Sequence, residues 1–300
     1  MVFPAFPPRL GEPRVVLSDP DFLVVEKPAG MHTAPGASGG DVPGREIPGG
    51  EDRSAPSLAE WVFDRNPEIR GIEGRGRGEG GLLHRLDRET SGLVLFARSG
   101  EAYLALSRAA EEGLFRKEYV LRARPAGRDL PGSRPGRAVP SGVDPDEWKC
   151  LRDESTTPGD GSSPRQGYDR AKGLRALLAE SLGAGRPVFT SGIFRPYGPK
   201  AARVACADPN ADLGRSRSVW CAAVYRTDFL AASEEDGALC LRVSLIRGFR
   251  HQIRAHLAWI GLPLEGDEVY GEGKGDRLAL HAAALEIPHP RTGAMVRIEE

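Results

Sequence analysis

Cysteine is scarce in this sequence, and no two cysteines are spaced as a metal-binding or redox pair. The 300-residue chain has four of them, Cys150, Cys206, Cys221 and Cys240. That density is too low for a disulfide framework, and Cys-x-x-Cys spacing is missing. We therefore expect reduced thiols and a cytoplasmic protein.

Long apolar runs are missing as well. No stretch approaches the ~20 apolar residues that a membrane helix needs. Prolines interrupt residues 1–9, so this segment lacks the apolar core of a signal peptide. With 40% hydrophobic and 28% charged residues, the composition is that of a soluble globular protein without a membrane partner.

Neither sign of charge dominates. Lysine and arginine total 41 against 42 aspartate and glutamate residues, which gives a net charge of -1. Nucleic-acid-binding proteins are usually basic, so the overall charge does not indicate one. A local basic groove is nevertheless sufficient for such binding.

Hydrophobic periodicity predicts alternating strands and helices. Ser57 and Glu60 form a capping box at the start of a short helix. A further helix has Ile253, Leu257 and Ile260 on one face, and its first turn contains polar residues. The pattern between residues 188 and 207 is mixed and predicts no element. The remaining predicted helices are 101–112 and 168–182, and the predicted strands are 14–18, 22–26, 93–97, 116–123, 219–230, 239–245 and 278–287.

Two features suggest ligand sites that other observations argue against. Residues 71–81 are rich in glycine, but a helix precedes them and a strand follows, the reverse of a dinucleotide-binding loop. We interpret them as a flexible connection. His251 and His256 are five residues apart, which does not place them on one helical face, and no acidic third ligand is near. We therefore expect no metal site.

A polar cluster stands directly before the buried strand 93–97. Asp87 lies there between Arg85 and Arg88. A solvated turn with surface ion pairs would have the same composition. A carboxylate ringed by arginines at the mouth of a buried strand is also well placed for chemistry, and other parts of the chain favour this second interpretation.

Five blocks of sequence, in order along the chain, resemble those of the RluA-type pseudouridine synthases. Any single block is a weak signal, but their shared order is a strong one. The blocks are Glu26-Lys27-Pro28-Ala29-Gly30, His84-Arg85-Leu86-Asp87-Arg88-Glu89-Thr90-Ser91-Gly92-Leu93, Lys117-Glu118-Tyr119, His251-Gln252-Ile253-Arg254-Ala255-His256-Leu257 with Gly261, Pro263, Gly266-Asp267 and Tyr270-Gly271, and Leu280-His281-Ala282 with Pro288-His289-Pro290.

The resemblance implies an α+β fold, with a mixed, largely antiparallel sheet bent around a central catalytic cleft and flanked by helices. It implies an isomerase that converts a uridine in structured ribosomal or transfer RNA to pseudouridine. Asp87 would be the catalytic carboxylate, attacking either the base or the ribose, Tyr119 would stack on the base, and Arg254 would pair with Asp87. Arg85 would enter the RNA stack that the flipped uridine leaves. His84, Lys117, His251 and Gln252 would also bind substrate.

The same resemblance implies which partners the protein binds and how its domains are arranged along the chain. The isomerisation requires no cofactor and no metal. We expect the protein to be a monomer that binds RNA and not DNA. We expect an extended lead-in at 1–13 and one catalytic domain over 14–300, with loop insertions at 34–56 and 125–166 and no N-terminal small RNA-binding domain. One departure is Gly248-Phe249-Arg250-His251-Gln252, where the family usually has Gly-Arg-Thr-His-Gln.

Two other functions remain as alternatives. A catalytically silent RNA-binding protein could share the scaffold, although Asp87, Tyr119 and Arg254 are all present. A hydrolase with paired carboxylates would need a second inward acid, and near Asp87 the sequence offers only Glu89.

Overall fold

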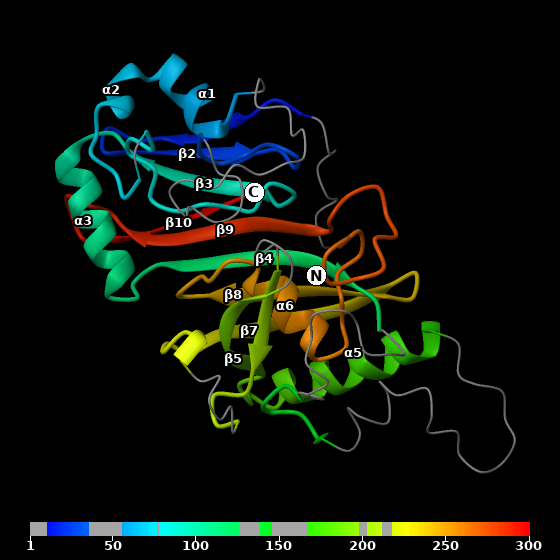
Figure 1. Cartoon of the computed structure of the whole chain (residues 1–300). Coiled ribbons are helices and arrows are strands. Elements are labelled where there is room, and N and C mark those ends of the chain that lie inside the picture. Colours follow the sequence, from blue (N-terminus) through cyan, green and yellow to red (C-terminus); the bar gives the residue numbers. More distant parts are fainter. Residues whose placement is uncertain are drawn as a thin grey trace, which may run out of the picture. The chain divides into compact units, whose positions relative to one another are not determined.

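The chain divides into two compact units. The computed structural model describes residues 11–35, 56–76, 78–125, 139–145, 167–197, 203–211 and 218–300 (Figure 1). The first unit holds the described residues up to 117 together with 281–300, and the second holds those of 118–280.

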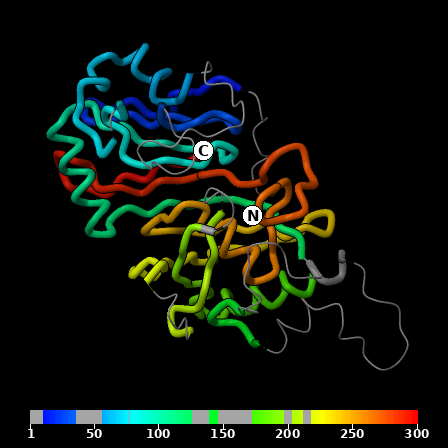
Figure 2. Tube along the Cα trace, viewed as in Figure 1, coloured from blue at the N-terminus to red at the C-terminus, as the bar shows by residue number. Residues whose placement is uncertain are grey.

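The first unit is a sheet whose last strands come from the end of the chain. Its strands follow the order β1-β2-β3-β9, and β10 pairs with β9. All pairings are antiparallel except β3 with β9, which is parallel. In Figure 2 the segment coloured red therefore returns beside the blue and cyan strands. The elements are β1 (Arg14–Ser18), β2 (Phe22–Lys27), α1 (Leu58–Arg65), α2 (Pro67–Arg70), β3 (Ser91–Ala97), α3 (Gly100–Glu111), β9 (Leu280–Pro288, of which Leu280 belongs to the second unit) and β10 (Met295–Glu299).

Strand β3 is the centre of the first unit. All seven of its residues are buried, and it packs with α3 in an apolar cluster of this unit. Gly92 is the second residue of the strand and has a φ of 116°, and an added Cβ would overlap the backbone of Ala282 on β9. Glycine is therefore required where these two strands approach, directly after the polar cluster.

The strands of the second unit follow the order β4-β8-β7-β5-β6, and the pairings of β8 with β7, β7 with β5 and β5 with β6 are antiparallel. A two-residue turn at Asp236 and Gly237, both with positive φ, joins β7 to β8, as expected for a tight hairpin. Helix α5 packs on β7 and β8, while α6 contacts β5, β6 and β7. The elements are β4 (Arg116–Ala123, which begins in the first unit), α5 (Gly167–Gly183), β5 (Phe189–Tyr197), β6 (Arg203–Ala207), β7 (Tyr225–Glu235), β8 (Ala238–Leu245) and α6 (Gln252–Trp259).

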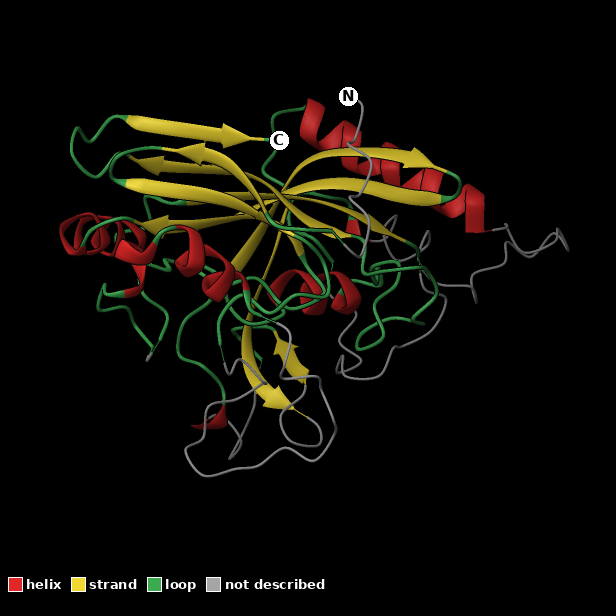
Figure 3. Ribbon diagram, turned by 90° about the horizontal axis from the view of Figure 1, so that it is seen from above, coloured by secondary structure: helices red, strands yellow, loops and turns green. Residues whose placement is uncertain are grey.

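The predicted fold class is confirmed. Strands predominate and helices are few, and the sheet pairings are mixed but largely antiparallel (Figure 3). The capping box of α1 is present in both directions, since Ser57 accepts from the Glu60 N–H and the Glu60 carboxylate accepts from the Ser57 N–H. In the part of the chain that the structure describes, no helix combines the length and apolar character of a membrane span.

Several predicted boundaries are wrong. Residues 188–207, left unassigned, contain β5 and β6. The strand predicted at 219–230 begins six residues later, at Tyr225. Residues before it form turns, because Trp220 is buried against β5 and β6 and Cys221 donates its N–H to Phe194. A local apolar pattern does not distinguish such a packed turn from a strand.

Some predictions concern residues outside the described part of the chain. This applies to Cys150, to 1–10 of the lead-in, and to most of 34–56 and 125–166. The other three cysteines are free thiols, as expected. The single domain over 14–300 stays a prediction.

One buried histidine predicts acid sensitivity. His256 of α6 is fully buried, its Nδ1 lies 2.9 Å from Thr227 Oγ1, and burial lowers its pKa from 6.5 to about 3. In the unfolded chain the His256 imidazole takes up a proton near pH 6.5, whereas in the folded chain it stays neutral down to about pH 3. The free energy of unfolding is therefore highest above pH 6.5 and falls as the pH drops toward 3. Between pH 7 and pH 5 this residue should cost about 2 kcal/mol.

Urea unfolding of the wild type and His256→Gln at pH 7, 6 and 5 measures this loss. We expect His256→Gln to be less stable than the wild type at pH 7. Its free energy of unfolding should fall by about 2 kcal/mol less than that of the wild type between pH 7 and pH 5. Equal pH dependence in the two proteins would contradict a buried neutral imidazole.

Candidate active site

Asp87 lies on a turn between an isolated bridge and β3. Leu82 bridges to Phe96 before the turn, and the Thr90 N–H donates to the Asp87 carbonyl at 3.1 Å. The Asp87 side chain is half-buried, so its carboxylate combines partial shielding from water with access to a ligand.

A buried lysine holds this turn from behind. Lys27, at the end of β2, is 0% exposed, and its Nζ donates to the carbonyls of Pro28 (2.9 Å), Met31 (2.8 Å) and Arg88 (3.0 Å). Arg88 directly follows Asp87. The ammonium of Lys27 therefore ties two segments to one point through charge-assisted hydrogen bonds.

Two further contacts join the same segments. The Gly30 N–H donates to the Arg88 carbonyl at 2.8 Å, and Arg88 Nε donates to the Gly30 carbonyl at 3.0 Å. Thr33 Oγ1 donates to the Leu86 carbonyl at 2.8 Å and accepts the Leu86 N–H at 3.2 Å. The backbone on both sides of Asp87 is thus fixed by the segment that follows β2.

Lys27→Met tests this support. Methionine keeps the length of the side chain but leaves the Pro28 and Met31 carbonyls without the ammonium, which should lower the free energy of unfolding by about 2 kcal/mol. Urea unfolding measures the loss. The control is Lys274→Met, because Lys274 pairs with Glu272 at the surface with 86% of its side chain exposed. Similar losses in both variants would contradict the role of Lys27.

The charge of Lys117 acts on the imidazole of His84 in the first unit. His84 Nε2 accepts the Leu95 N–H at 3.3 Å, so the proton of the neutral ring is on Nδ1. Burial, and then the charge of Lys117, hold the pKa of His84 well below 6.5. Burial, and then the charge of Arg75, lower the pKa of Lys117 to about 8. At neutral pH the pair is one neutral donor and one cation.

Tyr119 belongs to the second unit. It is 7% exposed on β4, and strand alternation places it on the same face of β4 as Lys117. Glu118 points to the opposite face, where its carboxylate accepts from Arg242 Nε at 2.8 Å. The pattern Lys-x-Tyr therefore places the Lys117 ammonium and the Tyr119 ring on one face of β4. The ion pair of Glu118 with Arg242 lies on the other face.

Arg254 is held by a carboxylate that the sequence did not predict. Its Nε and Nη2 each donate to one oxygen of Asp267 at 2.8 Å, and both side chains are buried. Burial would raise the pKa of Asp267, but the Arg254 bonds and the N–H groups of Tyr270 and Val269 outweigh it, so this pKa lies below its usual value. Nη1 is the guanidinium nitrogen that neither bond to Asp267 uses.

His251 and Gln252 lie at the start of α6, as predicted, but differ in access. His251 is partly buried with φ of 55°, and its Nδ1 lies 3.0 Å from the Tyr270 hydroxyl. Gln252 is 2% exposed, accepts the Phe249 N–H at 2.9 Å and donates to the Arg226 carbonyl at 2.9 Å. These bonds give Gln252 a structural task, and its contact with substrate stays a prediction.

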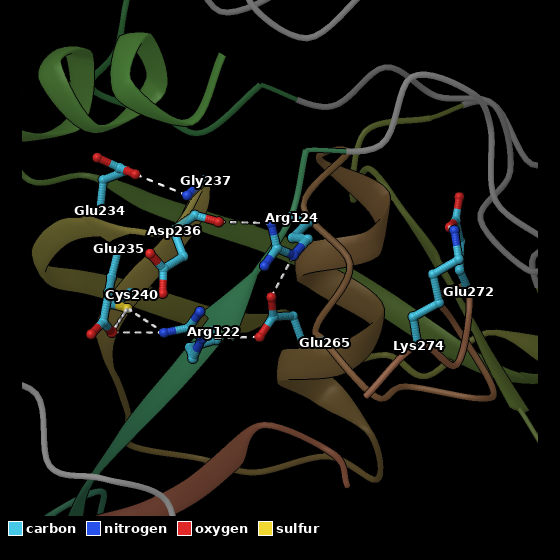
Figure 4. A network of polar contacts seen from close by, with 10 residues as sticks. All are labelled: Arg122, Arg124, Glu234, Glu235, Asp236, Gly237, Cys240, Glu265, Glu272 and Lys274. Carbon is cyan, nitrogen blue, oxygen red and sulfur yellow. Dashed lines mark hydrogen bonds and ion pairs between the residues drawn. The ribbon is translucent and has the colours of Figure 1, made fainter. Parts of the chain in front are cut away.

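An ion network supports the loop that contains Asp267 (Figure 4). Glu265 accepts from Arg122 Nε at 2.9 Å and also pairs with Arg124, so one arginine of β4 and one directly after β4 bind this loop. Arg122 also pairs with Glu235 at 2.7 Å, at the end of β7. The chain that follows α6 is thereby attached to β4 and to the β7–β8 hairpin.

The structure places the predicted residues in two groups. His84, Arg85, Asp87 and Lys117 belong to the first unit, and Tyr119, His251, Gln252 and Arg254 belong to the second. The meeting of Asp87, Tyr119 and Arg254 therefore stays a prediction.

Sequence reasoning gave no role to Lys27 or Asp267, although both lie within the quoted blocks. Their partners are carbonyls of another segment and a guanidinium on another element, so no local pattern identifies them.

Only one group of described residues has the geometry of a metal site. Ligand atoms of Asp19, Asp21 and His289 lie within 4.8 Å of one another. Arg291 donates to both oxygens of Asp21, which places a positive charge where a cation would bind. The group is better explained as an ion-pair cluster.

Curated relatives of this chain are RNA pseudouridine synthases. It is 24% identical over 294 residues to the "Uncharacterized RNA pseudouridine synthase YhcT" of Bacillus subtilis (strain 168), covering 97% of this chain and 69% of that protein. It is 24% identical over 298 residues to the "Ribosomal large subunit pseudouridine synthase C" of Escherichia coli (strain K12), covering 95% of this chain and 65% of that protein. The chain thus spans about two thirds of the length of these relatives.

Solved structures show the same fold. Human RNA Pseudouridylate Synthase Domain Containing 1 superposes with a TM-score of 0.55 at 17% identity, covering 96% of this chain and 83% of that one. Human RNA Pseudouridylate Synthase Domain Containing 4 gives 0.53 at 14% identity, covering 95% and 87%. At these identities the likeness establishes the fold alone.

The family follows from the span of the match. The model of the RNA pseudouridylate synthase family matches residues 21–259, which include the first three blocks, the 251–257 part of the fourth and every predicted site residue. This confirms the resemblance and, at the level of the family, an isomerase that acts on RNA uridine. The chain belongs to the RNA pseudouridylate synthase family.

Proposed function

We propose that this protein converts a specific uridine of a structured RNA to pseudouridine, with Asp87 as the catalytic carboxylate. The observation that carries the proposal is the support of the Asp87 turn. Lys27, Gly30 and Thr33 fix the backbone on both sides of it, while the carboxylate itself remains half-buried. Fixed backbone and partial access are what a reacting group requires.

Arg254 is proposed as the partner that keeps Asp87 ionised. An arginine ~4 Å from a carboxylate contributes roughly 4 kcal/mol at an effective dielectric of 20, before desolvation and before the opposing charge of Asp267, which pairs with the same guanidinium, is subtracted. The bidentate bond to Asp267 supports this role because it removes the rotational freedom of the guanidinium. A guanidinium fixed in advance loses little entropy when it pairs.

Tyr119 and Lys117 are proposed to contact the substrate from one face of β4. Extruding a base from an RNA stack costs a few kcal/mol, and stacking on an aromatic ring returns about 1 to 3. The buried ring of Tyr119 is suited to this, and Lys117, with a pKa of about 8, is charged at neutral pH and can pair with a phosphate.

The reaction balances without a second substrate. The C1′–N1 bond of uridine breaks, a C1′–C5 bond forms, the C5 proton leaves and N1 gains a proton. Asp87 attacks either the base or C1′ of the ribose. Monomeric state and cytoplasmic location stay predictions.

Ribosomal RNA is the first substrate to test. The Escherichia coli relative bears the name of a large-subunit ribosomal pseudouridine synthase, and we propose the same RNA class here, with transfer RNA as the alternative. Because the net charge is only -1, we expect few phosphate contacts and modest salt dependence.

The deciding experiment incubates the purified protein with unmodified large-subunit RNA and with unmodified transfer RNA. Pseudouridine is then mapped at single-nucleotide resolution. The proposal expects one or a few uridines in one RNA class to convert with multiple turnovers. Binding without conversion in either class would favour the catalytically silent alternative.

A further inference from the structure

The glycine-rich segment before the active-site turn is folded around one carboxylate. Glu79 is 5% exposed, and its Oε2 accepts the Gly76 N–H at 3.2 Å. Its own backbone bonds at both ends, from the Glu79 N–H to the Gly76 carbonyl and from the Leu82 N–H to the Glu79 carbonyl, each at 3.2 Å. An added Cβ at Gly76 would overlap Glu79 Oε1, so the missing side chain makes room for the carboxylate.

The counter-ion of this carboxylate is Arg85. Glu79 Oε1 forms an ion pair with Arg85 Nη2, and the two side chains differ in access, 6% exposed for Glu79 and 45% for Arg85. A carboxylate removed from water is stable only when paired, so Glu79 binds the guanidinium strongly. One edge of Arg85 is anchored inside the protein, and much of the rest faces solvent two residues before Asp87.

Pairing changes what Arg85 can recognise. The pair has no net charge, so the attraction of Arg85 for phosphate is largely cancelled. Its flat face and the N–H donors that Glu79 does not use remain, and these suit stacking on a base and hydrogen bonds to base edges.

We propose that Glu79 is a positioning residue that holds Arg85 as a charge-neutral pair, so that Arg85 meets an RNA base and not a phosphate. This rests on the proposed function of the chain in RNA modification. It assigns the glycine-rich segment the task of presenting one arginine at a fixed place beside the active-site turn.

Salt dependence of RNA binding separates a base contact from a phosphate contact. Each phosphate contact to single-stranded RNA contributes about 0.7 to the log-log slope of affinity against salt. The slope is measured for the wild type, Arg85→Gln and Glu79→Gln on a uridine-containing stem-loop. We expect Arg85→Gln to leave the slope within about 0.3 and Glu79→Gln to steepen it by about 0.7, since the freed arginine regains its charge.

Turnover provides the second readout on the same variants. Both substitutions should lower kcat about tenfold or more with KM changed by less than about threefold, because Arg85 loses its place or its donors. Gly76→Ala keeps every charge but displaces the Glu79 carboxylate, and it should lower kcat in the same way. A flattening of the slope by about 0.7 in Arg85→Gln would show a phosphate contact and overturn the proposal.

The matched control is Asp64→Asn. Asp64 pairs with Arg70 at 3.3 Å at the surface of the same unit, with both side chains more than 60% exposed. It should change neither slope nor kcat. If Asp64→Asn steepens the slope as much as Glu79→Gln does, the effect is one of net charge, and the proposal fails.

Thermal unfolding without RNA tests the pair independently of the proposed function. Arg85→Gln should lower the unfolding temperature more than the double variant Glu79→Gln/Arg85→Gln, because only the single variant leaves a buried carboxylate unpaired. If the double variant instead loses as much stability as the two single variants combined, Glu79 and Arg85 do not form the proposed pair. Wild-type protein that makes no pseudouridine would overturn the proposed function alone, since this comparison would remain valid.

Discussion

Asp87→Asn is expected to abolish pseudouridine formation and to leave RNA binding within about threefold of the wild type. The amide has nearly the same size as the carboxylate, and Lys27 and Thr33 would still hold the turn on both sides. Loss of the reacting group itself costs the largest factor in an enzyme, here at least about 10 000-fold in kcat. Single-turnover conversion of a uridine-containing RNA, with binding measured in parallel, tests both parts.

Glu89→Gln is the matched control for that variant. Glu89 lies two residues along the same turn, is partly exposed, and contacts Arg88 at 3.8 Å. The same change from carboxylate to amide should there alter kcat by less than about threefold, since exposed pairs contribute 0–1 kcal/mol. Substantial conversion by Asp87→Asn would remove Asp87 from its proposed role, whatever the control shows.

Asp267→Asn is expected to destabilise the second unit by about 3–5 kcal/mol, because it leaves the buried guanidinium of Arg254 without its counter-charge. It should also lower kcat, since Arg254 would no longer be held in place. Urea unfolding followed by tryptophan fluorescence measures the first effect at pH 7. The control Glu272→Gln removes a carboxylate from an exposed pair with Lys274 and should cost less than about 1 kcal/mol.

The pH dependence identifies the cause of that loss. The pKa of Asp267 is depressed in the folded protein, so its stabilisation is present above the usual aspartate value of about 3.9 and is lost as pH falls through the depressed value. The gap between wild type and Asp267→Asn should therefore be constant from pH 5 to pH 8 and narrow below about pH 4. If the difference in free energy of unfolding between wild type and Asp267→Asn is unchanged at pH 3, the loss is caused by packing and not by the lost charge.

Local features of the sequence predicted the elements whose signals are local. The capping box of α1 is one, because its two bonds join residues three apart. Helix α3 is another, since its apolar face lies within the element. The alternation in β8 predicted the strand correctly but not its burial, since residues on both of its faces are buried. Strands β5 and β6 were missed because β6 is recognisable mainly through its pairing with β5, and β5 through its pairing with β6 and β7.

The candidate site divides in the same way. Asp87 and Arg254 were predicted as site residues because their neighbours form recognisable blocks of sequence, and these roles stay predictions. The groups that hold these residues were not found, since Lys27 reaches Arg88 across 61 residues and Asp267 reaches Arg254 across a helix and its loop. Residues 71–81 were interpreted as a flexible connection, because glycine content by itself does not indicate that a buried carboxylate needs the space.

By itself the sequence determined the family and the fold class and predicted the side chains that would react, because these depend on residue types and their order. Only the tertiary structure decided which of these side chains are anchored and by what: Arg254 by Asp267, Arg85 by Glu79, and the Asp87 turn by Lys27. The physical reason is burial. A charge that leaves water must find a partner wherever the fold places one, and no rule of spacing along the chain specifies that place.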